Sequence, residues 1–189
     1  MDEQVFLQCY GVHGSPAMLL LMKVLTALGS GWMIVPLVPL YFWRPATKRF
    51  AASLFWTFSV TAVLVFILKI IIRRPRPCNS IAGVTGLFGT PNDFSCPSGH
   101  ASGSFAFGLF AVMLLMRHAH LHPARAGRCF VLSAFTLALV TAIAYSRIYL
   151  GAHFPGDVVA GAILGGTMGV VGARRHVTRL ASRAASDTK

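Results

Sequence analysis

Three short polar clusters stand at the ends of hydrophobic stretches that are long enough to cross or nearly cross a bilayer. They are the segment from Lys69 to Pro77, the tetrapeptide Pro97-Ser98-Gly99-His100, and the segment from Ser146 to Asp157. Ionisable residues that face inward at the end of a membrane helix are costly to keep, so they mark functional sites. Together the clusters supply cations, imidazoles and a carboxylate, which are the groups needed to bind a phosphate and break its ester bond.

The first cluster contains two cations of different geometry. Lys69 and Arg76 are seven residues apart, two helical turns, so they can share one helix face. The lysine would supply a point charge, and the arginine a planar fork that binds two phosphate oxygens at once. Pro77 biases Arg76 out of the helix and into an extended turn. We expect the intervening Arg73 and Arg74 to reach the lipid headgroups instead, as basic side chains at helix ends often do.

The second cluster, Pro97-Ser98-Gly99-His100, begins the next hydrophobic stretch. Proline suits the first turn of a helix, where unpaired backbone N–H groups attract anions. Gly99 lets the backbone approach a phosphate closely, and the Ser98 hydroxyl can donate to it. The alternative is a simple helix cap followed by a small-residue packing face that contains Gly99 and Gly103.

In the third cluster, Arg147 ends one hydrophobic stretch and Asp157 begins the next. A carboxylate four residues after His153 can hold one imidazole nitrogen protonated and leave the other free as a nucleophile. Pro155-Gly156 makes the intervening segment a turn into a helix, so the spacing does not by itself guarantee contact. A purely structural hydrogen bond between the two side chains is the alternative.

In chain order the three clusters resemble the pattern KxxxxxxRP, PSGH and SRxxxxxHxxxD of the type 2 phosphatidic acid phosphatase family, over residues 69–157. Every fixed position of the pattern is present. The resemblance implies a metal-independent phosphatase built from five or six helices. It implies that His153 attacks phosphorus to form a phosphohistidine, that Asp157 orients it, and that His100 protonates the departing oxygen and later activates water. The residues that the resemblance assigns to the phosphate oxygens are Lys69, Arg76, Ser98, Gly99 (through its amide) and Arg147.

The composition places these clusters in an integral membrane protein. Hydrophobic residues make up 55% of the 189 residues and charged residues only 12%, with a mean hydropathy of +0.66. We predict a single all-α membrane-embedded domain, residues 1–189, with about five to six transmembrane helices. Spans are expected at 51–72, 101–117, 129–145 and 157–173, and a short one at about 30–43 after an interfacial helix at about 16–28. One long broken span over 17–43 is the alternative.

The basic residues outside the clusters set the expected orientation. The net charge is +12, from 17 Lys and Arg against 5 Asp and Glu. Many basic residues flank the spans away from the clusters, and the positive-inside rule assigns them to the cytoplasmic side. They are Arg44, Lys48, Arg49, Arg117, Arg125, Arg128, Arg174, Arg175, Arg179, Arg183 and Lys189. We therefore expect a plasma (inner) membrane protein whose site faces the extracytoplasmic, periplasmic side. The same pattern argues against nucleic-acid binding.

Asp93 and Asp157 are the only carboxylates away from the chain termini, which leaves too few acids for a two-metal site. We expect neither a metal nor another cofactor. Cys78 and Cys96 bracket a loop rich in Gly, Thr and Asn on the same face as the clusters. Either a disulfide or two free thiols would fit there.

The membrane setting favours a lipid substrate. The leading one is a polyprenyl (undecaprenyl-type) diphosphate, followed by phosphatidic acid or phosphatidylglycerol phosphate. Two other classes stay open: a non-catalytic lipid-phosphate binding or transport protein, and a vanadium haloperoxidase, which shares this kind of oxyanion pocket but is larger and soluble. Gly161, Gly165 and Gly169 predict a close-packing face, either within the monomer or between the monomers of a homo-oligomer.

Overall fold

The computed structural model describes residues 2–11, 14–30, 37–87, 89 and 92–186. The only extended pairing among these residues is an isolated bridge between Leu87 and Gly89, so the predicted all-α class is confirmed. The helices are, in order, α1 (Asp2–Cys9), α2 (Pro16–Leu28), α3 (Leu37–Trp43), α4 (Pro45–Ile72), α5 (Pro77–Ser80), α6 (Gly99–Leu121), the 3₁₀ turn η3 (Pro123–Arg125), α7 (Ala126–Tyr149) and α8 (Pro155–Ser186).

Four of the described helices, α4, α6, α7 and α8, are long and apolar enough to cross a membrane. They cover the spans predicted at 51–72, 101–117, 129–145 and 157–173, and the chain is an integral membrane protein. The sequence predicted a further crossing at about 30–43, but residues 31–36 lie outside the described part of the chain. What is described of that segment contains α3, and the apolar α2 coincides with the helix predicted at about 16–28.

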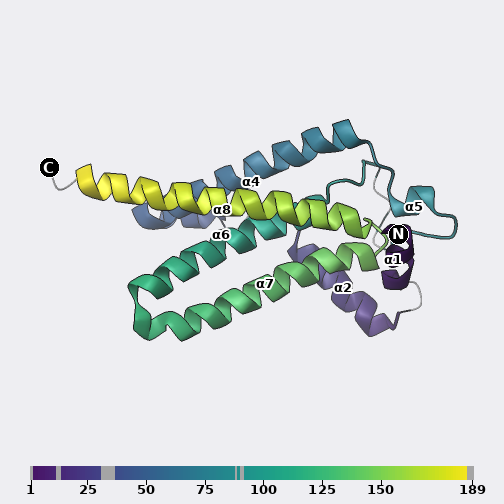
Figure 1. Cartoon of the computed structure of the whole chain (residues 1–189), viewed down its shortest axis with the longest axis horizontal. Coiled ribbons are helices and arrows are strands. Elements are labelled where there is room, and N and C mark those ends of the chain that lie inside the picture. Colours follow the sequence, from purple (N-terminus) through teal and green to yellow (C-terminus); the bar gives the residue numbers. More distant parts are fainter. Residues whose placement is uncertain (1, 12–13, 31–36, 88, 90–91, 187–189) are drawn as a thin grey trace.

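Proline and cap residues place the helix ends beside the polar clusters. Arg73 ends α4 in the left-handed conformation, with φ 51°. Ser98 caps α6, where its hydroxyl accepts a hydrogen bond from the Ala101 N–H at 3.4 Å. Pro155 begins α8 shortly after α7 ends. As a result, the ends of α4 and α7 and the starts of α6 and α8 all lie toward one end of the molecule (Figure 1).

A row of glycines brings α8 into close contact with α6. A Cβ on Gly161, Gly165 or Gly169 would come within 2.6, 2.0 or 2.4 Å of a backbone oxygen of α6 or its cap residue, so larger residues would force the helices apart. The packing face predicted from the glycine repeat is therefore used within the monomer. It holds the start of α6 beside the start of α8, where two of the three clusters lie.

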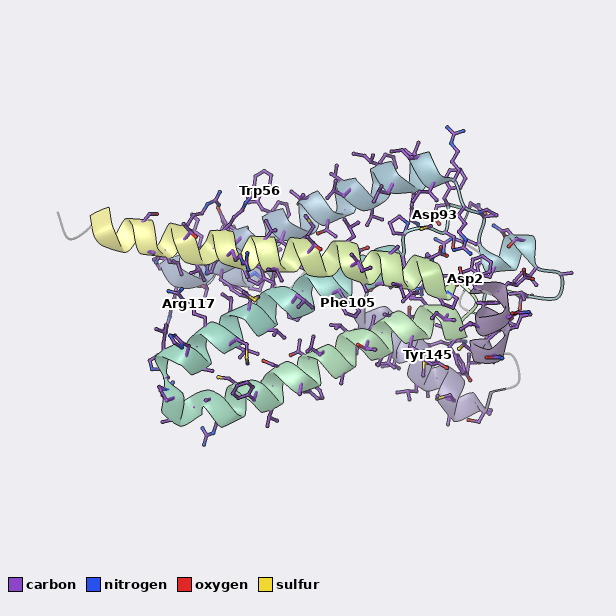
Figure 2. All side chains as sticks on the ribbon, in the orientation of Figure 1. Asp2, Trp56, Asp93, Phe105, Arg117 and Tyr145 are labelled. Carbon is purple, nitrogen blue, oxygen red and sulfur yellow. The ribbon has the colours of Figure 1, made fainter. Side chains whose placement is uncertain are left out.

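The loop between α6 and α7 and the C-terminal half of α8 lie at the opposite end of the long helices (Figure 1). Figure 2 shows Arg117 far from Asp2 and Asp93, which lie at the end where the clusters gather. The described basic residues that flank the spans, at the start of α4, at the loop between α6 and α7, and in the C-terminal half of α8, are thus separated from the polar clusters along the helix axes. That the end with the polar clusters faces the extracytoplasmic side stays a prediction of the positive-inside rule.

Candidate active site

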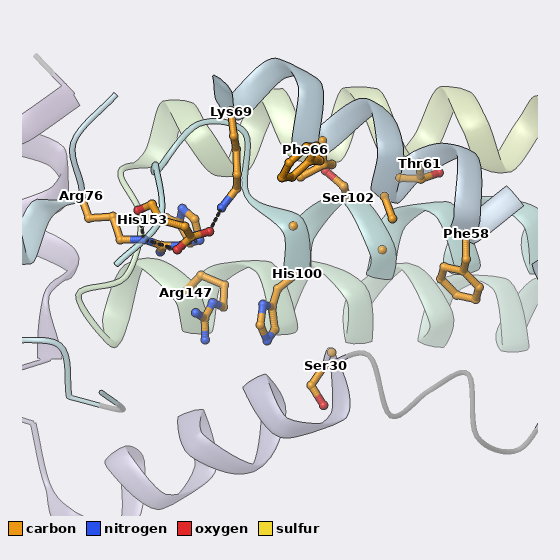
Figure 3. A pocket seen from close by; sticks show the side chains of 16 residues that line it. Ser30, Phe58, Thr61, Phe66, Lys69, Arg76, His100, Ser102, Arg147 and His153 are labelled. Carbon is orange, nitrogen blue, oxygen red and sulfur yellow. Dashed lines mark hydrogen bonds and ion pairs between the residues drawn. The ribbon is translucent and has the colours of Figure 1, made fainter. Parts of the chain in front are cut away.

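A cavity of about 540 Å³ lies between α4, α6 and the turn from α7 to α8, with a polar and an apolar end (Figure 3). The apolar end is lined by α4, where Phe58, Ala62, Val65 and Phe66 face the cavity. The polar end is lined by residues of all three clusters: Lys69, Arg76, Gly99, His100, Arg147 and His153. The structure therefore brings together most of the site residues that the sequence predicted.

Asp93, from the loop before α6, forms ion pairs with both cations of the first cluster, Lys69 and Arg76. Its carboxylate forms an ion pair with Lys69 Nζ, and Arg76 Nη2 donates to Oδ1 at 2.6 Å. Burial raises the pKa of the Asp93 carboxyl, but hydrogen bonds from Lys69 and Arg76 outweigh that effect, and the net pKa is lowered. A carboxylate therefore stands where the sequence predicts that phosphate oxygens bind. No sequence pattern had assigned Asp93 to this position.

The hydrogen bonds of the buried His153 fix its tautomer. Arg76 Nη1 lies 3.1 Å from His153 Nε2. Because a guanidinium has no acceptor, Nε2 must carry the lone pair, and the proton of the neutral ring is on Nδ1. Nδ1 lies 3.3 Å from Ser95 Oγ, and the Ser95 hydroxyl donates to Asp157 Oδ2 at 2.5 Å. The nitrogen that carries the lone pair, which accepts the hydrogen bond from Arg76 here, therefore lies on the side of the cations.

His153 is also held in the neutral form that a nucleophile needs. Burial lowers its pKa to about 4; the positive charges of Arg76 and Arg147 act in the same direction, and Asp157 opposes them. At pH 7 the imidazole therefore carries no proton on Nε2.

The expected contact between His153 and Asp157 is indirect. His153 Nδ1 and Asp157 Oδ2 are 3.9 Å apart, which is too long for a hydrogen bond, and Ser95 connects them. The reason is local: α8 begins at Pro155, so His153 precedes the helix and the two side chains do not follow helical spacing. Sequence reasoning missed the fully buried Ser95, whose only signal was its place two residues before Pro97.

Arg74 does not reach toward the headgroups as expected. Its Nη1 donates to Asp157 Oδ1 at 2.8 Å, and its Nη2 donates to Asp2 Oδ2 at 2.6 Å. Arg73, by contrast, is exposed, and its Nε donates to the carbonyl of Ile70 at 2.9 Å. α4 ends at Ile72, and the left-handed backbone at Arg73 changes the direction of the chain before Arg74. Two adjacent arginines with the same sequence signal therefore have different surroundings.

Arg147 and His100 complete the polar end of the cavity. Arg147 is buried, and its Nη1 donates to the Thr26 hydroxyl of α2. Its Nε is buried without a hydrogen-bond partner in the described part of the chain. A buried, unpaired guanidinium N–H is costly, so it favours an anion in the cavity. His100 lies in the first turn of α6, and its imidazole lies close to Arg147 (Figure 3).

The two remaining predicted residues differ in their access to the cavity. Gly99 lines it at the start of α6, where unpaired backbone N–H groups carry partial positive charge. Ser98 is fully buried; its hydroxyl caps α6, and its N–H donates to the Asp157 carbonyl at 3.0 Å. The helix-cap alternative therefore describes Ser98 in this structure, and its contact with phosphate stays a prediction.

Cys78 and Cys96 are both free thiols, so the disulfide that their spacing allowed is not formed in this structure. Cys78, in α5, packs against a core cluster that contains Phe6 and Phe154. For Cys96, burial and the neighbouring charge of Asp157 raise the pKa of the thiol. The two side chains thus have different partners, and the contacts of Arg74 and Asp93 hold the loop segments together instead.

The helical membrane fold and the cationic pocket with two histidines define a membrane protein whose pocket has the charges that suit a phosphate group. The family model of the PAP2 superfamily matches residues 50–180 of this chain. The chain therefore belongs to the PAP2 superfamily, as its three motifs indicated.

Named relatives agree with this assignment. An undecaprenyl-diphosphatase from Sulfolobus acidocaldarius is 30% identical over 145 residues, which are 77% of this chain and 64% of that protein; the chain thus spans less than two thirds of it. A decaprenylphosphoryl-5-phosphoribose phosphatase from Mycobacterium tuberculosis is 31% identical over 159 residues, 82% of this chain and 79% of that protein. The crystal structure of a transmembrane PAP2 type phosphatidylglycerolphosphate phosphatase from Bacillus subtilis has the same fold, with a TM-score of 0.73, 23% identity, and coverage of 90% and 82%.

Proposed function

We propose that this protein is a membrane lipid phosphatase that uses His153 as its nucleophile and requires no metal. One observation carries the proposal: a single cavity joins two histidines and three cations to an apolar wall along α4. The polar end suits a phosphate, and the apolar end suits a hydrocarbon chain. A protein that only bound or transported lipid phosphates would not need a neutral, buried imidazole held in one tautomer.

In the proposed reaction, the Arg76 guanidinium exchanges its hydrogen bond to His153 Nε2 for one to a phosphate oxygen. Nε2 then attacks phosphorus while the bond from phosphorus to the leaving oxygen breaks. The ring gains positive charge, which the relay from Nδ1 through Ser95 to Asp157 stabilises. His100, in the protonated form that the bound phosphate anion stabilises, donates a proton to the leaving oxygen. It then takes a proton from the water that hydrolyses the phosphohistidine. The cations at the polar end hold the phosphate oxygens through both steps.

For the substrate we propose a polyprenyl diphosphate that is hydrolysed on the extracytoplasmic face. Two of the relatives described above are named for polyprenyl-linked substrates. Phosphatidic acid or phosphatidylglycerol phosphate is the second candidate, supported by the fold shared with the Bacillus subtilis enzyme. The orientation is supported by the basic residues at the opposite end of the helices. Labelling of Cys96 by a membrane-impermeant thiol reagent on intact cells would check it.

Phosphate release by the purified protein, measured against a panel of lipid phosphates and diphosphates, tests the proposed function. We expect kcat/KM for a polyprenyl diphosphate to exceed that for phosphatidic acid by about tenfold or more. We also expect excess EDTA to leave the rate unchanged, because the described residues contain no group of three or more His, Cys, Asp or Glu side chains that could hold a metal ion. The absence of phosphate release from every lipid would overturn the proposal. A loss with EDTA that Mg²⁺ restores would overturn the mechanism.

Asp93 competes with the substrate for Lys69 and Arg76, so removing its charge should tighten phosphate binding. We expect Asp93→Asn to lower the inhibition constants of inorganic phosphate and vanadate by about three- to tenfold. Asn92→Ala, at the adjacent exposed position, is the matched control and should leave both constants unchanged. Weaker binding of the two anions to Asp93→Asn would show instead that Asp93 holds the cations in their productive positions.

A further inference from the structure

Arg74 lies between two carboxylates from distant parts of the chain. Its Nη1 donates to Asp157 Oδ1 at 2.8 Å and its Nη2 to Asp2 Oδ2 at 2.6 Å. The guanidinium carbon also lies 4.1 Å from the centre of the Phe154 ring. Asp157 is fully buried, whereas the side chains of Arg74 and Asp2 are 31% and 32% exposed. Arg74 therefore connects the solvent-facing N-terminal helix to the buried carboxylate of the site.

The two oxygens of Asp157 face different partners. Oδ1 accepts the hydrogen bond from Arg74, and Oδ2 accepts hydrogen bonds from Ser95 and from the Phe154 N–H at 2.9 Å. With both oxygens engaged, the carboxylate plane is fixed, and Oδ2 is directed at the relay that reaches His153 Nδ1. A fully buried carboxylate is costly unless it is paired with a cation. Within the described residues, two side chains form a salt bridge with Asp157: Arg74 and, if it is protonated, His153.

Asp2 fixes Arg74 in turn. Its second oxygen, Oδ1, accepts a hydrogen bond from the Gly156 N–H at 2.9 Å, in the first turn of α8. The helix that carries Asp2 is anchored by Phe6, which is fully buried and packs edge-on against Phe154 at 5.5 Å. The N-terminal helix α1 thus holds both the arginine and the start of the helix that carries Asp157.

We propose that Arg74, held in place by Asp2, is a positioning residue that keeps the Asp157 carboxylate ionised and aimed at the relay to His153. Arg74 acts through Asp157 and is not among the residues that line the cavity. The N-terminal helix α1 is then a part of the active site, although it contributes no group that touches the substrate. This inference rests on the proposed function of His153 as the nucleophile.

The test compares the two adjacent arginines. Arg74→Gln should lower kcat by about ten- to hundredfold and change KM by less than about threefold, because it disturbs the nucleophile and leaves the phosphate-binding cations in place. Asp2→Asn should lower kcat by a smaller factor, about three- to tenfold. Arg74→Lys, which keeps the charge but loses the fork, should recover part of the rate. Arg73→Gln is the matched control and should stay within about twofold of the wild type.

A double-mutant cycle separates positioning from general stability. In an Asp157→Asn background, Arg74→Gln should lower kcat by less than about twofold, because the carboxylate on which it acts is gone. An unchanged kcat for Arg74→Gln would overturn the inference, and so would a raised KM with an unchanged kcat. Additive losses in the cycle would show a merely structural arginine. Failure of the proposed function looks different: either the wild type releases no phosphate, or a His153→Ala variant turns over normally.

Discussion

Replacing His153 with alanine should reduce phosphate release to the background, at least about 10⁴-fold below the wild type. The expected loss is this large because, in the proposed mechanism, His153 Nε2 forms the bond to phosphorus. No other neutral nitrogen in the described part of the cavity has the same support from Ser95 and Asp157. Phosphate release from a polyprenyl diphosphate and from a generic phosphomonoester would both be measured.

The His153→Ala variant also offers a positive control for the role of the ring. Lys69, Arg76 and Arg147 remain in place, so inorganic phosphate should still bind and still raise the thermal midpoint of the detergent-solubilised protein. Added imidazole should restore part of the turnover by taking the place of the missing ring. Turnover near the wild-type rate without imidazole would show that His153 is not the nucleophile.

Replacing His100 with alanine should have the second largest effect, and its size should depend on the leaving group. With a lipid substrate whose leaving oxygen needs a proton, we expect a loss of about 10²–10⁴-fold. With p-nitrophenyl phosphate, whose leaving group departs without a proton, the first step should survive. The second step should still be slow because no base activates the water, so one equivalent of p-nitrophenol should appear as a burst.

The matched control for His100 is His120→Ala, on the same helix but at its other, exposed end. This variant should behave like the wild type with both substrates. An equal loss of His100→Ala activity on both substrates, with no burst, would contradict the role of His100 as acid and then base.

The membrane spans and most of the site residues could be predicted because local patterns determine them. Long apolar runs form helices in a bilayer, because a helix satisfies all of its backbone hydrogen bonds internally. The positions of these runs therefore predicted α4, α6, α7 and α8. The three motifs lie at the ends of those runs, so alternating helix direction brings them to one end. The close packing of α6 and α8 followed from the spacing of Gly161, Gly165 and Gly169.

The remaining contacts could not be predicted, because they depend on the path of loops and on single turns. Ser95, Asp93 and Asp2 reach the site from segments with no motif of their own. Arg73 and Arg74 have the same chemistry and adjacent positions, and only the left-handed turn at the end of α4 distinguishes them. For the same reason, the sequence could not predict that Cys78 and Cys96 are free thiols in this structure, or that Ser95 connects His153 to Asp157.

Trapping the covalent intermediate tests the central claim most directly. The protein would be mixed with ³²P-labelled substrate, quenched in base within one turnover, and digested for mass spectrometry. We predict a base-stable, acid-labile phosphate on His153, attached at Nε2, that accumulates further in the His100→Ala variant when the labelled substrate is p-nitrophenyl phosphate. Phosphate found on another residue, or full single-turnover product release with no phosphoenzyme at any quench time, would contradict the assignment of His153 as the nucleophile.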